Sequence, residues 1–122
     1  MHVRLSASPP AALPFPRFAV GVDIDADCAR VTPRGELDLV TVPPLECAIG
    51  ELCEQGVTDV VLDLSELTFF DSTALCLLLR LDARLRDECR GFRIVVGEGV
   101  PARVLAVTRM RNRFRCEDAD RG

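Results

Sequence analysis

The chain has 122 residues, of which 48% are hydrophobic and 28% charged, and its formal net charge at pH 7 is −4. This length is most simply one domain with one hydrophobic core, and this composition is typical of a soluble globular protein. The negative charge argues against direct nucleic-acid binding, because a phosphate backbone is bound by a basic surface.

Neither the cysteines nor the N-terminal segment indicates secretion, a cofactor or a membrane. The six cysteines include no C-x-x-C pair of the kind found in metal and redox sites, so we expect buried thiols and no metal ion or other cofactor. Prolines interrupt any apolar signal segment, and the uncharged run at residues 72–79 is far shorter than the ~20 residues of a membrane span. We therefore expect a cytoplasmic protein.

The first elements in the chain are predicted to be a tail and a β-hairpin. Residues 1–17 are rich in proline and alanine without periodicity, which predicts a flexible tail. From Phe18, apolar residues occupy every second position, which predicts a half-buried strand that ends at the acidic turn of residues 23–27. Residues 29–37 then form a second strand, most simply the antiparallel partner of the first.

A helix and a central strand are expected next. Thr41 can cap the helix, apolar residues recur at helical spacing from Leu45 to Cys53, and Gly56 stands where a helix commonly stops. The β-branched run at residues 57–64 is typical of a central strand covered on both faces.

The second half continues the alternation of helices and strands. A helix follows the turn at Asp71 and extends to about Cys89, before Gly91; then come a strand at residues 92–96 and a helix opened by Pro101. Residues 114–117 form an optional last strand. This order predicts an α/β layered domain over residues 18–118, with a C-terminal tail at residues 119–122. We expect a mixed, mostly parallel sheet of four or five strands, an antiparallel edge hairpin, and helices packed on the sheet.

The turn before the second helix carries two hydroxyl groups. Asp71 or Ser72 can cap the helix by accepting a hydrogen bond from a free backbone N–H, and that role alone explains a polar pair here. Alternatively, Thr73 presents its hydroxyl for phosphorylation, which adds roughly −1.5 to −2 charges at a point where a partner can dock. Residue types alone leave both interpretations open.

The helix after this turn has more apolar surface than one core face requires. Leu75 and Leu79 lie off the core-facing stripe, so they are either deeply buried or contact a partner. The stripe itself consists of Ala74, Leu77, Leu78, Leu81 and Leu85.

Three segments together resemble the STAS domain of bacterial anti-sigma factor antagonists. They are Gly-Glu-Leu-Asp at residues 35–38, Val-Val-Leu-Asp-Leu-Ser at residues 60–65 and Phe-Asp-Ser-Thr-Ala-Leu at residues 70–75. The resemblance covers about residues 18–117 and implies the STAS fold. It also implies phosphorylation of the second hydroxyl residue, Thr73, with Ser72 as second choice.

The resemblance further implies partner switching in transcription regulation and stress response. The unphosphorylated form would bind an anti-sigma factor and release the sigma factor. That anti-sigma factor would be a serine/threonine kinase of the histidine-kinase-like ATPase fold, and a metal-dependent phosphatase would reverse the modification. The partner-binding residues expected from this match and from the apolar pattern are Asp38, Asp71, Ser72, Thr73, Leu75, Cys76 and Leu79.

No catalytic motif competes with this interpretation, and we expect a binding protein, not an enzyme. The only histidine is His2, the loop at residues 97–99 lacks the P-loop lysine, and the aspartates at residues 23–27 lack the glycine and glutamate of an EF-hand loop. The arginines at residues 109–115 suit a solvated face or an acidic partner. Two alternatives stay open: a STAS scaffold or regulatory subunit that is not phosphorylated, and thiol-based sensing through Cys76.

Overall fold

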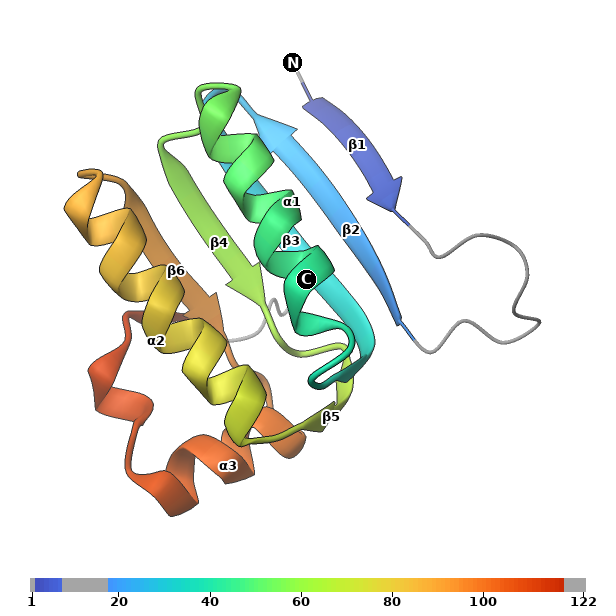
Figure 1. Cartoon of the computed structure of the whole chain (residues 1–122), viewed down its shortest axis with the longest axis vertical. Helices are drawn as coiled ribbons and strands as arrows, with labels where there is room; N and C mark the ends of the chain where they lie inside the picture. Colours follow the sequence, from blue (N-terminus) through green and yellow to red (C-terminus); the bar gives the residue numbers. More distant parts are fainter. Residues whose placement is uncertain (1, 8–17, 118–122) are drawn as a thin grey trace.

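The chain folds into a mixed β-sheet with two helices packed against one face and a third helix at one end of the sheet (Figure 1). The structure is a computed structural model that describes residues 2–7 and 18–117. Its elements in chain order are β1 (His2–Ala7), β2 (Phe18–Asp25), β3 (Cys28–Leu37), α1 (Val42–Glu54), β4 (Asp59–Asp63), β5 (Leu67–Phe70), α2 (Ser72–Asp87), β6 (Gly91–Val95), α3 (Val100–Thr108), the 3-10 helix η1 (Arg111–Arg113) and β7 (Cys116–Glu117).

The seven strands lie in the order β1-β2-β3-β4-β6-β7, and β5 pairs with β3 beside this path. The β1–β2 and β2–β3 pairings are antiparallel, whereas β3–β4, β3–β5, β4–β6 and β6–β7 are parallel. The predicted α/β class, with its antiparallel edge and mostly parallel sheet, is confirmed. The part of the chain that the structure describes has seven strands instead of four or five, because the sequence patterns predict neither β1 nor β5.

Strand β1 lies in the segment expected to be a flexible tail. Its backbone pairs with β2 from His2 opposite Asp25 to Ala7 opposite Val20, so the expectation is wrong for this stretch. The sequence does carry a period-two signal there, Val3, Leu5 and Ala7, which the proline-rich residues that follow conceal. The rest of that predicted tail, residues 1 and 8–17, and the C-terminal tail at residues 119–122 lie outside the described residues.

Helix α1 ends as its sequence predicts but begins differently. Gly56 takes a left-handed φ of 102°, and the Val57 N–H donates to the Leu52 carbonyl over 3.1 Å, which forms a Schellman stop. Thr41 occupies the N-cap position, yet its side chain makes no capping bond to the helix. The Thr41 hydroxyl instead donates to the Glu36 carbonyl over 2.7 Å, so this residue ties the helix entry to β3.

Helix α2 ends before the glycine that suggested its stop. Cys89 adopts a φ of 58°, and the Arg90 N–H donates to the Leu85 carbonyl over 2.7 Å, again a Schellman geometry. Gly91 is the first residue of β6 instead. A β-carbon at Gly91 would meet the Asp59 carboxylate on the neighbouring strand, so a larger residue here would require the exposed Asp59 side chain to move.

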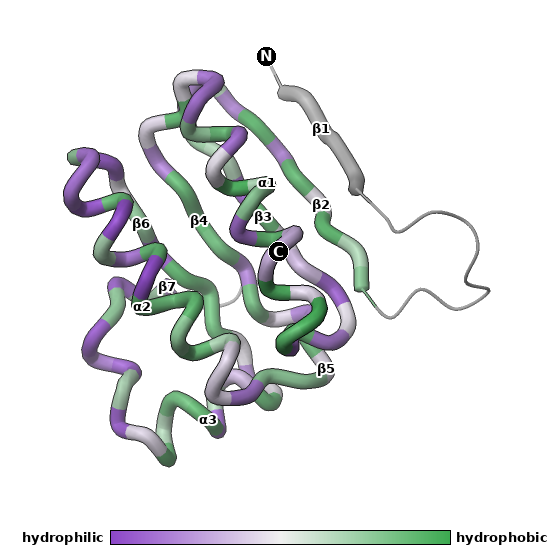
Figure 2. The backbone as a smooth tube through the Cα atoms, in the orientation of Figure 1, coloured by the Kyte–Doolittle hydropathy of each residue, from purple (hydrophilic) through white to green (hydrophobic). Residues whose placement is uncertain are grey.

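The core lies between the sheet and helices α1 and α2. Val31, Leu62 and Ile94 are register partners across three parallel strands, and all three are fully buried. Figure 2 shows β4 as a mostly hydrophobic central strand, while hydrophilic residues gather in the C-terminal half of α2. The predicted core-facing stripe of α2 is confirmed, with Ala74, Leu77, Leu78, Leu81 and Leu85 each no more than 1% exposed.

The opposite face of the sheet is polar. Arg30, Val61 and Arg93 are register partners there, and Val61 is buried between the two long side chains. Arg30 pairs with Asp63 over 2.8 Å, and Arg93 pairs with Glu117 over 3.1 Å. Two ion pairs of the described residues therefore lie on this face of the sheet.

Candidate functional site: the turn before helix α2

Strand pairing places two of the predicted site residues beside each other. Leu37, at the end of β3, and Phe70, at the end of β5, are register partners in parallel strands. The next residue in each chain segment is an aspartate, Asp38 after β3 and Asp71 after β5. The loop into α1 and the turn into α2 thus share one edge of the sheet, at the lower end of the molecule in Figure 1.

Asp71 caps helix α2. Its backbone is extended (φ −125°, ψ −167°), and its Oδ1 accepts hydrogen bonds from the Thr73 N–H over 3.0 Å and the Ala74 N–H over 3.2 Å. A carboxylate here also complements the positive end of the helix dipole. Of the two capping candidates, Asp71 and Ser72, the structure therefore selects Asp71.

The two hydroxyls are left without internal partners. Ser72 is exposed and Thr73 is half-buried in the first turn of α2. Within residues 18–117, neither the Ser72 nor the Thr73 hydroxyl makes a hydrogen bond to another protein group. Because Asp71 already caps the helix, both hydroxyls are free for chemistry with a partner.

Asp38, which the motif predicts to be a partner-binding residue, also shapes the loop between β3 and α1. Its Oδ1 accepts hydrogen bonds from the backbone N–H groups of Val40, over 3.0 Å, and Thr41, over 3.2 Å. The Asp38 N–H in turn donates to the Thr41 hydroxyl over 2.8 Å. One oxygen of this carboxylate is thus engaged within the loop, and Asp38 holds the loop in shape.

The apolar and thiol residues predicted for partner binding lie along α2 at differing depth. Leu75 and Leu79 are half-buried and pack against the core, so each offers only part of its side chain to a partner. Cys76 is exposed, one helical turn before Arg80, whose guanidinium pairs with Glu46 of α1 over 3.0 Å. The three residues line the same end of α2 as Thr73.

Two residues that the sequence reasoning missed stand out at this site. Leu39 is 74% exposed and Val40 is 79% exposed, in the loop between β3 and α1. The signal in the sequence is a pair of apolar residues between the end of a strand and the start of a helix, where no predicted element covers them. The sequence alone does not tell whether these two side chains are covered, because that depends on how the loop packs in the fold.

The Asp-Leu-Ser segment after β4 is structural. The Asp63 Oδ1 accepts from the Ser65 hydroxyl over 2.6 Å and from the Ser65 N–H over 2.9 Å, while Oδ2 pairs with Arg30. Burial works against the charged carboxylate, but these hydrogen bonds and Arg30 outweigh it and hold the pKa of Asp63 below its usual value. This part of the motif therefore shapes the exit of β4 and takes no direct part in the turn at Thr73.

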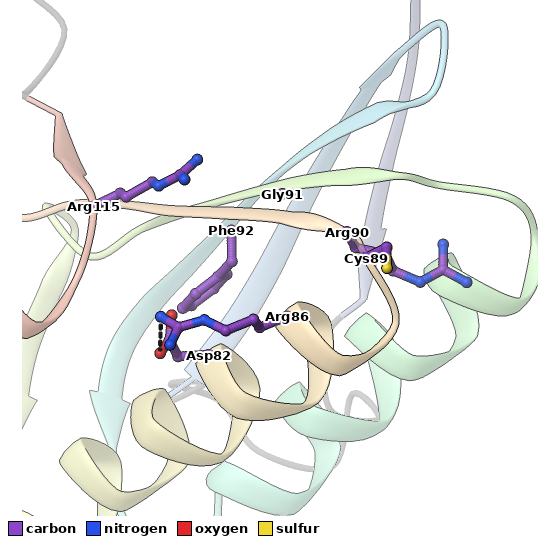
Figure 3. A pocket seen from close by; sticks show the side chains of 7 residues that line it. All are labelled: Asp82, Arg86, Cys89, Arg90, Gly91, Phe92 and Arg115. Carbon is purple, nitrogen blue, oxygen red and sulfur yellow. Dashed lines mark hydrogen bonds and ion pairs between the residues drawn. The ribbon is translucent and has the colours of Figure 1, made fainter.

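A pocket of about 250 Å³ lies at the other end of α2, against the start of β6 (Figure 3). Arg86 pairs there with Asp82 over 3.0 Å, and Arg90 pairs with Glu88 over 2.8 Å, so two of its three arginines are neutralised by neighbours. Its lining residues are Asp82, Arg86, Cys89, Arg90, Gly91, Phe92 and Arg115. The pocket is separate from the turn at Thr73, which lies at the N-terminus of the same helix.

The described part of the chain offers neither a metal site nor a membrane-spanning helix. Among residues 2–7 and 18–117, no group of three or more His, Cys, Asp or Glu side chains is arranged to hold a metal ion. In the same residues, none of the helices has the length and apolar character that crossing a membrane requires.

The fold and the turn define a small α/β domain that presents the N-terminus of one helix, with its free hydroxyls, at one edge of a mixed sheet. Residues 20–114 match a family model described as "Mlab, STAS domain". The chain belongs to the STAS-domain family, as the resemblance of its three motifs predicts.

Several named proteins resemble this chain in sequence or in structure. The anti-sigma-F factor antagonist RsfB of Mycobacterium tuberculosis is 32% identical to this chain over 81 residues, which span 66% of this chain and 66% of the relative. The crystal structure of an anti-sigma factor antagonist from Mycobacterium paratuberculosis superposes with a TM-score of 0.70 at 25% identity, over 94% of this chain and 92% of that one. SpoIIAA in its unphosphorylated form shares the fold, with a TM-score of 0.66 at 20% identity over 84% of this chain and 89% of that one.

Proposed function

We propose that this protein is an anti-sigma factor antagonist controlled by phosphorylation of Thr73. In its unphosphorylated form it binds a kinase-type anti-sigma factor, and the sigma factor is released. Phosphorylation by that kinase abolishes binding, and a metal-dependent phosphatase restores it. The names of the relatives support the antagonist role, and the turn before α2 supports the switch.

The observation that best supports the switch is that Asp71, and not a hydroxyl group, caps helix α2. Asp71 supplies the helix cap, so the Thr73 hydroxyl is not needed for stability. A phosphate on Thr73 lies at the positive end of a 16-residue helix, which tolerates negative charge. The fold should therefore survive modification, while the surface beside Asp38 and Asp71 gains a phosphate of roughly −1.5 to −2 charges that a docked partner would have to accommodate.

The choice of Thr73 over Ser72 rests on its place in the Asp-Ser-Thr motif. Among residues 18–117 neither hydroxyl makes a hydrogen bond to another protein group, so geometry permits either one. Ser72→Ala and Thr73→Ala are matched variants, since each removes one uncommitted hydroxyl and leaves the Asp71 cap in place. After incubation with ATP and the kinase-type anti-sigma factors of the same genome, we expect intact-mass analysis to show one added phosphate on wild type and on Ser72→Ala.

Thr73→Ala should remain unmodified in that experiment and bind the anti-sigma factor constitutively, whereas Thr73→Glu should bind weakly. Equal binding by wild type, Thr73→Ala and Thr73→Glu, with no added phosphate on any of them, would contradict the switch. That pattern would favour the scaffold alternative, in which the chain docks on another complex without being modified.

A further inference from the structure

The loop that joins β3 to α1 displays two adjacent apolar side chains. We call Leu39 and Val40 the loop tip; they are 74% and 79% exposed. Single exposed apolar residues are ordinary on protein surfaces, whereas two large ones in succession form a small contiguous apolar patch that a partner can cover. The loop tip is therefore a candidate contact surface in its own right.

The loop tip is held rigidly by the polar residues around it. Asp38 accepts hydrogen bonds from the N–H groups of Val40 and Thr41 and also fixes the Thr41 hydroxyl through its own N–H. The Asp38 carbonyl accepts from the Val42 N–H over 2.9 Å, which joins the loop to the first turn of α1. The polar groups are engaged inside the loop and the apolar groups point outward, so little conformational entropy is lost when a partner covers the tip.

The position of the loop tip connects it to the proposed phosphorylation site. Because Leu37 and Phe70 are register partners, the segment that carries the loop tip and the segment that carries Thr73 leave the sheet side by side. A single partner surface can therefore cover both. A phosphate on Thr73 would introduce a strongly hydrated dianion beside an apolar contact that must lose its water on binding.

We propose that Leu39 and Val40 are the apolar anchor that an uncharged, hydrophobic pocket of the anti-sigma factor receives, and that Asp38 is the positioning residue of this anchor. The proposal rests on the proposed function, since it names how the same partner is held. It separates two tasks at one edge of the sheet: the loop tip supplies affinity and partner choice, and Thr73 supplies the switch.

This separation has a kinetic consequence. The loop tip and the acceptor hydroxyl lie on segments that leave the sheet from neighbouring strands, so loss of the loop tip should weaken docking of the kinase without altering the phosphorylated group. We expect the KM for phosphorylation of a Leu39→Asn/Val40→Asn variant to rise while kcat stays near the wild-type value. A merely structural role of the loop would instead lower the thermal stability of the variant.

The test compares binding to the purified kinase-type anti-sigma factor by calorimetry. We expect Leu39→Asn and Val40→Asn each to weaken binding about tenfold, because burying one such side chain is worth at least that factor in an equilibrium constant. Leu39→Ile and Val40→Ile, which keep an apolar side chain at each position, should retain most of the wild-type affinity. Val107→Asn is the matched control: Val107 is 82% exposed near the C-terminal end of α3, outside both the loop tip and the turn at Thr73, and this variant should bind as wild type.

Two results overturn the proposal and can be told apart. Wild-type affinity of the Leu39→Asn/Val40→Asn variant, while Thr73→Glu still loses binding, would remove the anchor and leave the proposed function intact. Failure of the wild-type protein to bind any kinase-type anti-sigma factor of the same genome would remove both. Thermal unfolding of each variant serves as the folding control, and we expect no change because both side chains are exposed.

Discussion

The capping role of Asp71 gives the most quantitative prediction. Asp71→Ala removes the acceptor of two hydrogen bonds, from the Thr73 and Ala74 N–H groups, at the start of α2. Loss of an N-cap costs about 1 kcal/mol, and loss of a carboxylate at the positive end of the helix adds roughly 0.3–1 kcal/mol. We therefore expect the free energy of unfolding to fall by about 1–2 kcal/mol.

Urea denaturation followed by far-UV circular dichroism measures this change, because the chain has neither tryptophan nor tyrosine to report by fluorescence. With an m-value of about 2 kcal/mol per molar urea, near the middle of the usual range, the midpoint should fall by roughly 0.5–1 M. Asp71→Asn is the matched control, since an asparagine side chain also caps a helix, and it should lose less than half as much. Unchanged stability of Asp71→Ala, or an equal loss in Asp71→Ala and Asp71→Asn, would refute the capping argument.

Three further predictions concern the loop, the ion pair and the end of α2. Thr41→Val should weaken the loop into α1 by about 1 kcal/mol through loss of its hydroxyl bonds, while Thr41→Ser should not; equal urea midpoints would contradict this. Because the pKa of Asp63 is lowered in the folded state, its ionisation stabilises the fold above the ordinary value of about 3.9, and this contribution is lost as pH falls through the folded-state pKa. The free energy of unfolding of Asp63→Asn should therefore fall less steeply than that of wild type as the pH is lowered. Equal pH dependence of the two proteins would contradict the stabilising role of the ionised Asp63. Cys89→Gly should raise the free energy of unfolding by up to about 1 kcal/mol, because glycine adopts the left-handed backbone of this position without strain. An unchanged midpoint of thermal unfolding would contradict this prediction.

Short sequence patterns were sufficient to predict the helices and strands whose formation depends on their own residues. The alternation from Phe18 predicts β2, and the apolar spacing with Gly56 predicts α1 and its stop. Strand β5 was not predictable in this way, because its four residues are a strand only through pairing with the end of β3. The end of α2 was predicted wrongly because Gly91 suggested the stop. The left-handed residue that ends the helix is Cys89, and Gly91 begins β6.

For the candidate site, the position of the residues was predictable from the sequence and their individual roles were not. The motif predicts that Asp38 and Asp71 share a surface, and the Leu37–Phe70 register puts the two side by side. What the sequence does not carry is the assignment of tasks, because whether a polar group is engaged depends on neighbours brought together by folding. Asp71 as the cap, Asp38 as the support of the loop, and the exposed pair Leu39 and Val40 all follow from the structure.

The most direct test of the central claim is the affinity of the anti-sigma factor for two forms of this protein, unmodified and phosphorylated on Thr73. We predict that the unmodified form binds and that phosphorylation weakens binding by at least about a hundredfold, as expected when a dianion is placed in a desolvated interface, while the circular dichroism spectrum stays unchanged. Equal affinity of the two forms would contradict the account.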